Sequence, residues 1–127
     1  MDSTLEAYIE DKRIFSSNRN WLHPIFDLEQ LLEAMEYDRS TIEVYDRVVG
    51  RAAAFLFVNL GVKHVYADML SKPGMDALES FGLPFDYNEL VDRIECRTEE
   101  MLLDITDLKS GIATLREHVT ESGSRPA

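Results

Sequence analysis

The sequence predicts an α/β fold with three layers, α-β-α, in which a mixed β-sheet carries helices on both faces. The chain opens with two short alternating segments, residues 5–9 and 13–16, which flank Asp11-Lys12 and have the pattern of a β-hairpin. Strand-like and helix-like segments then alternate, which is typical of parallel strands joined by helices. A length of 127 residues suits one domain, because such a chain buries roughly two thirds of its unfolded surface.

The first half of the chain contains two predicted helices and one further strand. Pro24 starts a helix that continues to about Tyr37, with apolar residues three or four positions apart. A strand begins at Ile42 and runs into Asp46, where a helix enclosed by the fold begins. This helix ends near Leu60, and Gly61 is its C-cap.

The second half repeats the strand-to-helix unit. Residues 62–70 form a strand, and Ser71-Lys72-Pro73-Gly74 opens a helix at 75–81 that Gly82 closes. Residues 83–87 form a loop or an edge strand, residues 93–96 form a short strand, and residues 99–105 are ambiguous. A last helix starts after Thr106 or Asp107. We expect one domain over residues 1–119 and a flexible tail over 120–127.

Composition restricts the classes of partner. With 24 acidic and 13 basic residues, a formal net charge of -11 argues against nucleic acid polymers and anionic membranes. A single cysteine, Cys96, excludes an internal disulfide, and the sequence contains no signal-peptide pattern and no long apolar run. We therefore expect a cytoplasmic protein.

The most informative segment runs from Asp46 to Ala54. If a helix starts at Asp46, then Arg47 and Arg51 lie one turn apart, repel each other and oppose the positive end of the helix dipole. A negative group should compensate them. This placement indicates an anion site, to which Gly50 would allow close approach.

The start of the next helix extends this prediction. Ser71 and Lys72 add donors there, and a phosphate or carboxylate would suit exposed N–H groups at both helix starts. In the alternative, Asp46 caps its helix, Glu43 or a distant carboxylate neutralises the arginines, and Gly50 only lets the helix approach the sheet. Asp68, near the end of its strand, is either a further ligand-binding residue or an edge aspartate that faces solvent.

The segment 46–54, together with Leu60-Gly61-Val62, Val65-Tyr66-Ala67 and Ser71, resembles the bacterial domain-of-unknown-function family numbered eighteen ninety-three. The resemblance covers roughly residues 4 to 119. It implies a cytidine-deaminase-like fold, and it implies no reaction, because that family has no established one.

A zinc deaminase requires His-x-Glu or Cys-x-Glu at one helix start and Pro-Cys-x-x-Cys at the next. Both motifs are absent from the sequence, so zinc-dependent deamination is excluded as a working hypothesis, and we expect neither a metal ion nor another cofactor. The chain also departs from the resembled family after Ile94, where Cys96-Arg97-Thr98 leads directly to Glu99 and a loop is missing. Arg97 either turns into the anion site or pairs with Glu95 or Glu99.

Aromatic residues are expected to fill the core, unless an exposed ring lies beside Arg47, Arg51 or Ser71; these residues are Trp21, Phe26, Tyr37, Phe55, Phe57 and Phe81.

The leading functional hypothesis is a metal-free domain that binds a small ligand, either a nucleotide or another anionic metabolite. The first alternative is a structural or regulatory module that self-associates as a homo-oligomer. The second is a metal-independent enzyme that uses Asp46 or Asp68 as general base and the arginines as electrophilic clamps.

Overall fold

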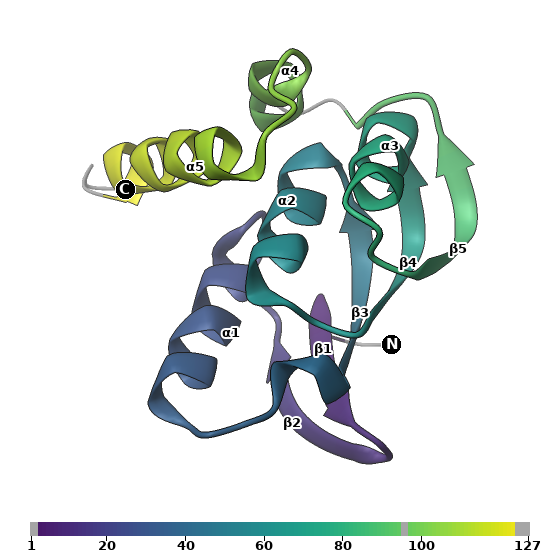
Figure 1. Ribbon diagram of the computed structural model, residues 1–127, viewed down its shortest axis with the longest axis vertical. Coiled ribbons are helices and arrows are strands. Elements are labelled where there is room, and N and C mark those ends of the chain that lie inside the picture. Colours follow the sequence, from purple (N-terminus) through teal and green to yellow (C-terminus); the bar gives the residue numbers. More distant parts are fainter. Residues whose placement is uncertain (1–2, 95–96, 124–127) are drawn as a thin grey trace.

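The computed structural model describes residues 3–94 and 97–123, with the side chains of all of these except 97 and 120–123. Five strands form one mixed sheet in the order β2-β1-β3-β4-β5, which confirms the α/β class (Figure 1). β1 pairs antiparallel with β2 and β3, and the pairs β3–β4 and β4–β5 are parallel. The strands are β1 Leu5–Ile9, β2 Lys12–Ser17, β3 Ile42–Val49, β4 His64–Ser71 and β5 Phe85–Val91.

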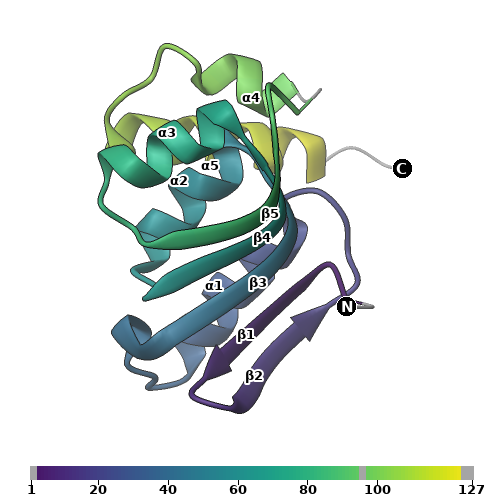
Figure 2. The ribbon, with the colours of Figure 1, turned by 90° about the vertical axis from the view of Figure 1, so that its right-hand side faces the viewer.

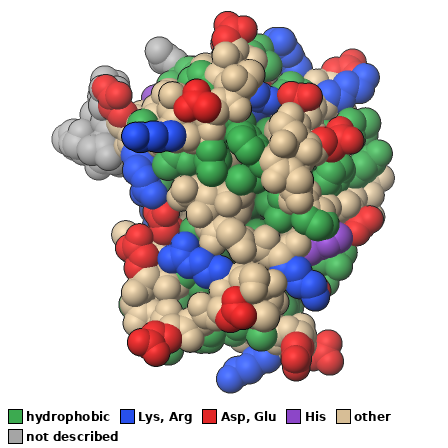
Figure 3. Space-filling view, viewed as in Figure 1, with side chains coloured by type: hydrophobic (Ala, Val, Ile, Leu, Met, Phe, Trp, Pro, Cys, Tyr) green, Lys and Arg blue, Asp and Glu red, His purple; other side chains and the backbone are tan. Residues whose placement is uncertain are grey.

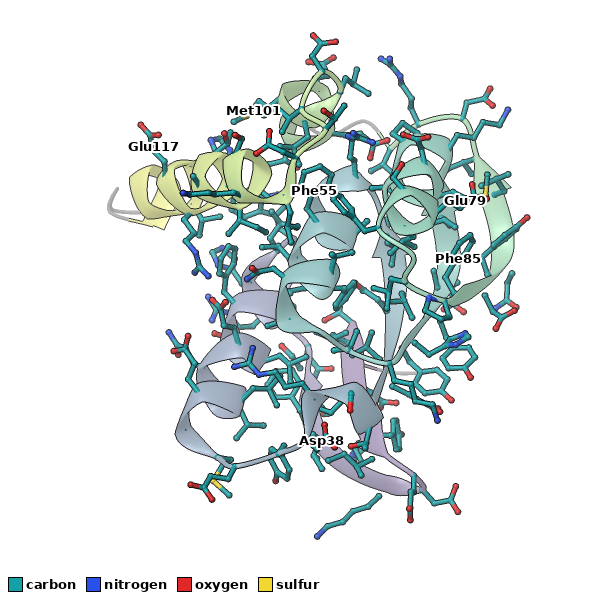
Figure 4. The ribbon with its side chains drawn as sticks, in the orientation of Figure 1. Asp38, Phe55, Glu79, Phe85, Met101 and Glu117 are labelled. Carbon is teal, nitrogen blue, oxygen red and sulfur yellow. The ribbon has the colours of Figure 1, made fainter. Side chains whose placement is uncertain are left out.

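Helix α2 forms the centre of the core, as its apolar sequence predicts. Phe55 and Phe57 are fully buried, and α2 contacts the four other α-helices (Figure 1). Phe55 lies between α2 and α5, where Gly111 of α5 leaves room for its ring (Figure 4). The helices are α1 His23–Ala34, the short 3-10 helix η1 Arg39–Thr41, α2 Arg51–Leu60, α3 Lys72–Ser80, α4 Arg97–Leu102 and α5 Leu108–Gly123.

The prediction of helices on both faces of the sheet is wrong for the part of the chain that the structure describes. Helices α1, α2 and α3 lie on the same side of the sheet (Figure 2). On β3, Ile42 and Val44 are buried under them, whereas Glu43 and Tyr45, which alternate with them, are only partly buried. This alternation is the signature of a sheet with one solvated face, and the outward residues are polar or aromatic and need no cover.

The boundary between β3 and α2 also differs from the prediction. The strand does not turn at Asp46 but continues to Val49, because Asp46, Val48 and Val49 pair with β4. Gly50 is the N-cap of α2, so Asp46 does not cap this helix. Arg47 therefore lies on a strand, and it does not share a helix face with Arg51.

Most other boundaries are confirmed. Gly61 adopts the left-handed conformation at the end of α2, with φ 77°. The Ser71 hydroxyl accepts a hydrogen bond from the Gly74 N–H, and the Asp107 carboxylate accepts one from the Ser110 N–H, so both residues cap helices. Helix α5 continues beyond residue 119 to Gly123.

The region after Gly82 resolves the ambiguous predictions. The edge strand is β5, which is longer than expected, and residues 97–102 form α4. Residues 93 and 94 are not in a strand, and 95–96 lie outside the described residues. No helix within the described ranges is both long enough and apolar enough to cross a bilayer.

Candidate functional site

A cavity of about 350 Å³ opens beside the start of α2, and we call it the α2 hollow. Two regions that are distant in sequence build most of it. The segment before α1, the end of β3 and the first turn of α2 meet there because β3 leads directly into α2 on the helix-bearing side of the sheet. The lining consists of Thr4, residues 19–22, Pro24, residues 46–48, Gly50, Ala52, Ala53, Ile94 and Thr98.

Asp46 brings a carboxyl group to this hollow. Burial raises the pKa of Asp46 to about 8, which the backbone N–H groups of Val48 and Arg47 only partly counteract by hydrogen-bonding the carboxylate. The nearby charge of Asp68 raises this pKa further. At neutral pH the Asp46 side chain is therefore mostly protonated, so it is uncharged and can donate a hydrogen bond.

Arg51 does not face the hollow as a ligand clamp, because its guanidinium is bonded within the chain. The side chain is only 6% exposed. Nε donates to the Leu102 carbonyl at 2.7 Å, and Nη2 donates to the Ile105 carbonyl at 2.6 Å. Nη1 reaches the Pro73 carbonyl and the Asp76 carboxylate, each at 3.2 Å. These contacts favour the structural alternative for Arg51.

Glu99 supplies a negative group at the start of α2 that the sequence requires but does not identify. Its side chain is 3% exposed. Oε2 accepts a hydrogen bond from the Arg51 backbone N–H at 3.3 Å, and Oε1 accepts one from the Ile94 N–H at 3.4 Å. A carboxylate at this place stabilises the positive end of the helix. The anion expected at this helix start is therefore a side chain of the same chain.

Two glycines allow the starts of α2 and α3 to meet. A Cβ atom on Gly74 would lie 2.9 Å from the carbonyl carbon of Gly50 and 3.0 Å from its oxygen. A Cβ atom on Gly50 would collide with the Glu99 carboxylate. Close approach is thus the role of both glycines. The sequence predicts this role for Gly50, but the neighbours that come close belong to the protein.

The other predicted site residues are dispersed. Ser71 is fully buried in its capping role, and Lys72 forms an ion pair with Asp92 at 2.8 Å. Asp68 is exposed and accepts a hydrogen bond from the Asn88 amide at 2.9 Å. The Arg97 side chain and Cys96 lie outside the described part of the structure. The structure brings together Asp46, Arg47 and Gly50 at the α2 hollow and leaves Asp68 and Lys72 out of its lining.

Trp21 is the aromatic residue that departs from the expected core packing. It is 39% exposed, has φ 62°, and lines the α2 hollow together with Arg19 and Arg47. Its ring contacts those of His23 and His118 edge-on, at centroid distances of 5.3 and 5.6 Å. Asp27 holds Arg19 through hydrogen bonds of 2.7 and 2.9 Å. The only signal in the sequence was a lone tryptophan outside any periodic apolar pattern.

Within the described residues, 3–94 and 97–123, no group of three His, Cys, Asp or Glu side chains is placed to hold a metal ion.

Comparison with known proteins identifies the family. The family model TM1506, described as a domain of unknown function (DUF1893), matches residues 2–119. The crystal structure of a DUF1893 family protein, TM1506 from Thermotoga maritima, is similar with a TM-score of 0.82 and 26% sequence identity. The similarity covers 92% of this chain and 81% of that one. No curated protein matches. The chain therefore belongs to the DUF1893 family, whose domain has no known function.

Proposed function

We propose that this protein is a metal-free domain that binds a nucleotide or another small anionic metabolite in the α2 hollow. One observation carries the proposal: an exposed tryptophan, Trp21, lines the same cavity as Arg47 and the protonated carboxyl of Asp46. This is the exposed ring beside Arg47 that would indicate stacking rather than core packing.

The size and lining of the hollow suit a small planar ligand. A volume of about 350 Å³ is near the lower end of the roughly 300–1,000 Å³ that is usual for ligand pockets. The Trp21 indole offers a flat apolar surface for a heterocycle, and Thr4, Asn20 and Thr98 add polar groups around it. A nucleobase or a ring of similar size matches this combination.

The charge of the hollow favours an anion although the whole chain is acidic. Arg19 and Arg47 line the hollow, and among the residues that the structure describes Asp46 is the only carboxyl in the lining. Because burial keeps Asp46 mostly protonated at neutral pH, it adds little repulsion. On the helix-bearing side as a whole, acidic and basic side chains are interspersed (Figure 3).

Trp21 makes a direct test possible because it is the only tryptophan of the chain. Protein stripped of metal is screened for thermal stabilisation by nucleotides, nucleosides, sugar phosphates and small carboxylates. Compounds that raise the Tm are then titrated while Trp21 fluorescence is recorded. We expect a compound with a phosphate or carboxylate to stabilise the protein and to quench the indole.

The matched variants are Arg47→Gln and Lys109→Gln, which each remove one positive charge. Lys109 is exposed on α5, outside the lining of the α2 hollow. Arg47→Gln should weaken binding roughly tenfold to a hundredfold, since hydrogen bonds to charged groups contribute about 1.5–3 kcal/mol. Lys109→Gln should leave binding unchanged. Stabilisation without any change in Trp21 fluorescence, or equal losses in both variants, would contradict the proposal.

A second candidate function is a metal-independent enzyme, and the environment of Asp46 favours it. Carboxyls with a raised pKa inside a cavity are common among catalytic acids. With a pKa of about 8, Asp46 would act as a proton donor at neutral pH rather than as the general base that the sequence suggested. Asp46→Asn should then abolish conversion of a bound compound, followed by NMR, while Trp21 quenching persists. If the wild-type protein leaves a bound compound chemically unchanged, the enzyme function is contradicted and only the binding function remains.

We also propose that this domain has a cytidine-deaminase-like scaffold and works in the cytoplasm of a bacterium. The family resemblance supports the scaffold, and the single cysteine is consistent with a reducing compartment.

A further inference from the structure

The face of the sheet opposite the helices carries a row of aromatic rings on three neighbouring strands. The Tyr8 and Tyr45 rings meet edge-on with centroids 5.4 Å apart, and Tyr45 stacks on Tyr66 at 4.5 Å with an angle of 10° between the ring planes. His64 continues the row by stacking on Tyr66 at 4.3 Å. We call this surface the tyrosine face. Neighbouring strands lie about 4.8 Å apart, so the tyrosine row crosses roughly 10 Å.

Two hollows flank the row and share Tyr45 as a wall. One has a volume of about 270 Å³ and the other about 340 Å³. The first contains the carboxylates of Asp68 and Asp86 beside the mostly protonated Asp46, and the second contains those of Glu6, Glu10 and Asp11. No lysine or arginine belongs to either lining within the described chain. The tyrosine face is therefore a place where aromatic surface and negative charge coincide.

Two basic side chains pair with carboxylates of this face. Arg13 pairs with Glu6 at 3.4 Å, and Lys63 pairs with Glu43 at 3.5 Å. Both basic side chains are more than half exposed, and such pairs contribute little in water. His64 contacts the Asp86 carboxylate at 2.8 Å. The surface therefore remains acidic, and a more strongly basic partner can replace Arg13 and Lys63 in these pairs.

We propose that the tyrosine face docks an extended, arginine-bearing segment of a partner protein. A guanidinium stacks on tyrosine rings and also pairs with carboxylates through two parallel hydrogen bonds, so it matches both features of the surface. Alternate residues of an extended segment point to the same side about 7 Å apart. Two such arginines would lie on either side of Tyr45, one in each hollow.

A second copy of this chain is a poor occupant of the same surface. Two tyrosine faces packed together would oppose their carboxylates, in a chain whose formal charge is already -11. The large exposed hydrophobic side chains of the described residues are Trp21, Met35, Val48 and Tyr87. Trp21 and Val48 both line the α2 hollow, and the four residues build no apolar helix face for pairing.

The test uses the full chain and an acetylated, amidated Gly-Arg-Gly-Arg-Gly peptide, with titration calorimetry and NMR of the tyrosine rings. Two double variants each remove two negative charges. Asp68→Asn/Asp86→Asn changes the tyrosine face, and Glu79→Gln/Glu117→Gln changes exposed residues of α3 and α5 (Figure 4). We expect the first pair to weaken peptide binding at least tenfold and the second pair less than threefold. Tyr45→Thr should lose binding, whereas Tyr45→Phe, which keeps the ring, should retain it.

Three results would overturn the proposal. Equal losses in the two double variants would mean that the peptide responds only to total charge. Spermidine that binds as tightly as the peptide, with the same dependence on Asp68 and Asp86, would identify a small polycation as the occupant. Absence of peptide binding, with dimers that Tyr45→Thr dissociates in sedimentation, would identify a second copy.

Discussion

The pKa of Asp46 differs strongly between the folded and the unfolded chain. Its pKa is about 8 in the fold, against about 3.9 for an aspartate in an unfolded peptide. Between these two pH values folding takes up a proton, so the free energy of unfolding decreases as the pH rises. Below about pH 4 the group is neutral in both states, and above about pH 8 the full destabilisation is present.

Replacing this carboxyl by an amide tests that inference. Asp46→Asn removes the titration, so its Tm should exceed that of the wild type by an amount that increases steadily from pH 5 to pH 8. Thermal unfolding followed by circular dichroism at several pH values measures the difference. Asp104→Asn removes a charge from an exposed aspartate that does not act on the Asp46 pKa, so it is the control and should show no such increase. Parallel curves for Asp46→Asn and wild type would mean that Asp46 is ionised in the fold.

The start of helix α2 depends on Glu99, a residue that is distant in the sequence. The Glu99 carboxylate accepts the Arg51 N–H, and Gly50 keeps the space that this carboxylate occupies. Glu99→Ala should cost about 1–2 kcal/mol, as the loss of a helix cap does. Gly50→Ala should also destabilise the protein, because its new methyl group meets the carboxylate.

The two substitutions should compensate each other in part, because without the Glu99 side chain the added methyl group no longer collides with it. The double variant should therefore be more stable than the sum of the single changes predicts, by about 0.5–3 kcal/mol, in urea unfolding. Gly61→Ala is the matched control. It has φ 77° and no atom within 4 Å of an added Cβ, so it should cost stability without coupling to Glu99→Ala. Additive costs for Gly50→Ala and Glu99→Ala would refute the collision.

The elements that local signals specify could be predicted from the sequence. Pro24, Gly61, Ser71 and Asp107 mark helix ends through their own backbone preferences or caps, and each is confirmed. The start of α2 could not be placed, because pairing between β3 and β4 extends the strand past Asp46. The secondary-structure propensity of a short stretch of sequence contains no information about hydrogen bonding between β3 and β4.

At the scale of the whole molecule, Arg51 joins elements that are distant in sequence. Its guanidinium binds the carbonyls of Pro73, Leu102 and Ile105, so one side chain connects α2 to α3 and to the end of α4 and the turn that follows it. The sequence left open whether this residue binds a ligand or stabilises the fold, because spacing cannot show partners 22 to 54 positions away. The same limit hid Glu99 and the position of Trp21.

Arg51→Ala should lower the free energy of unfolding by about 3–5 kcal/mol, since it leaves buried acceptors without a donor. Arg51→Lys should recover little of this, because a single ammonium cannot reach the same set of acceptors. Arg116→Ala is the comparison. The Arg116 side chain is 47% exposed and donates two hydrogen bonds to Glu29. Removing it should lower the free energy of unfolding by less than about 1 kcal/mol in the same urea titration. A small effect of Arg51→Ala would show that solvent or neighbouring groups replace its bonds.

The link between Arg51 and Glu99 also sets an order of events during translation. The N–H that needs this carboxylate is made 48 residues before its partner. At roughly 5–20 residues per second, the ribosome supplies Glu99 about 2 to 10 s later. During this interval β4, α3 and β5 are synthesised, and the start of α2 lacks the carboxylate that accepts its N–H. The last quarter of the polypeptide is therefore what completes the centre of the domain.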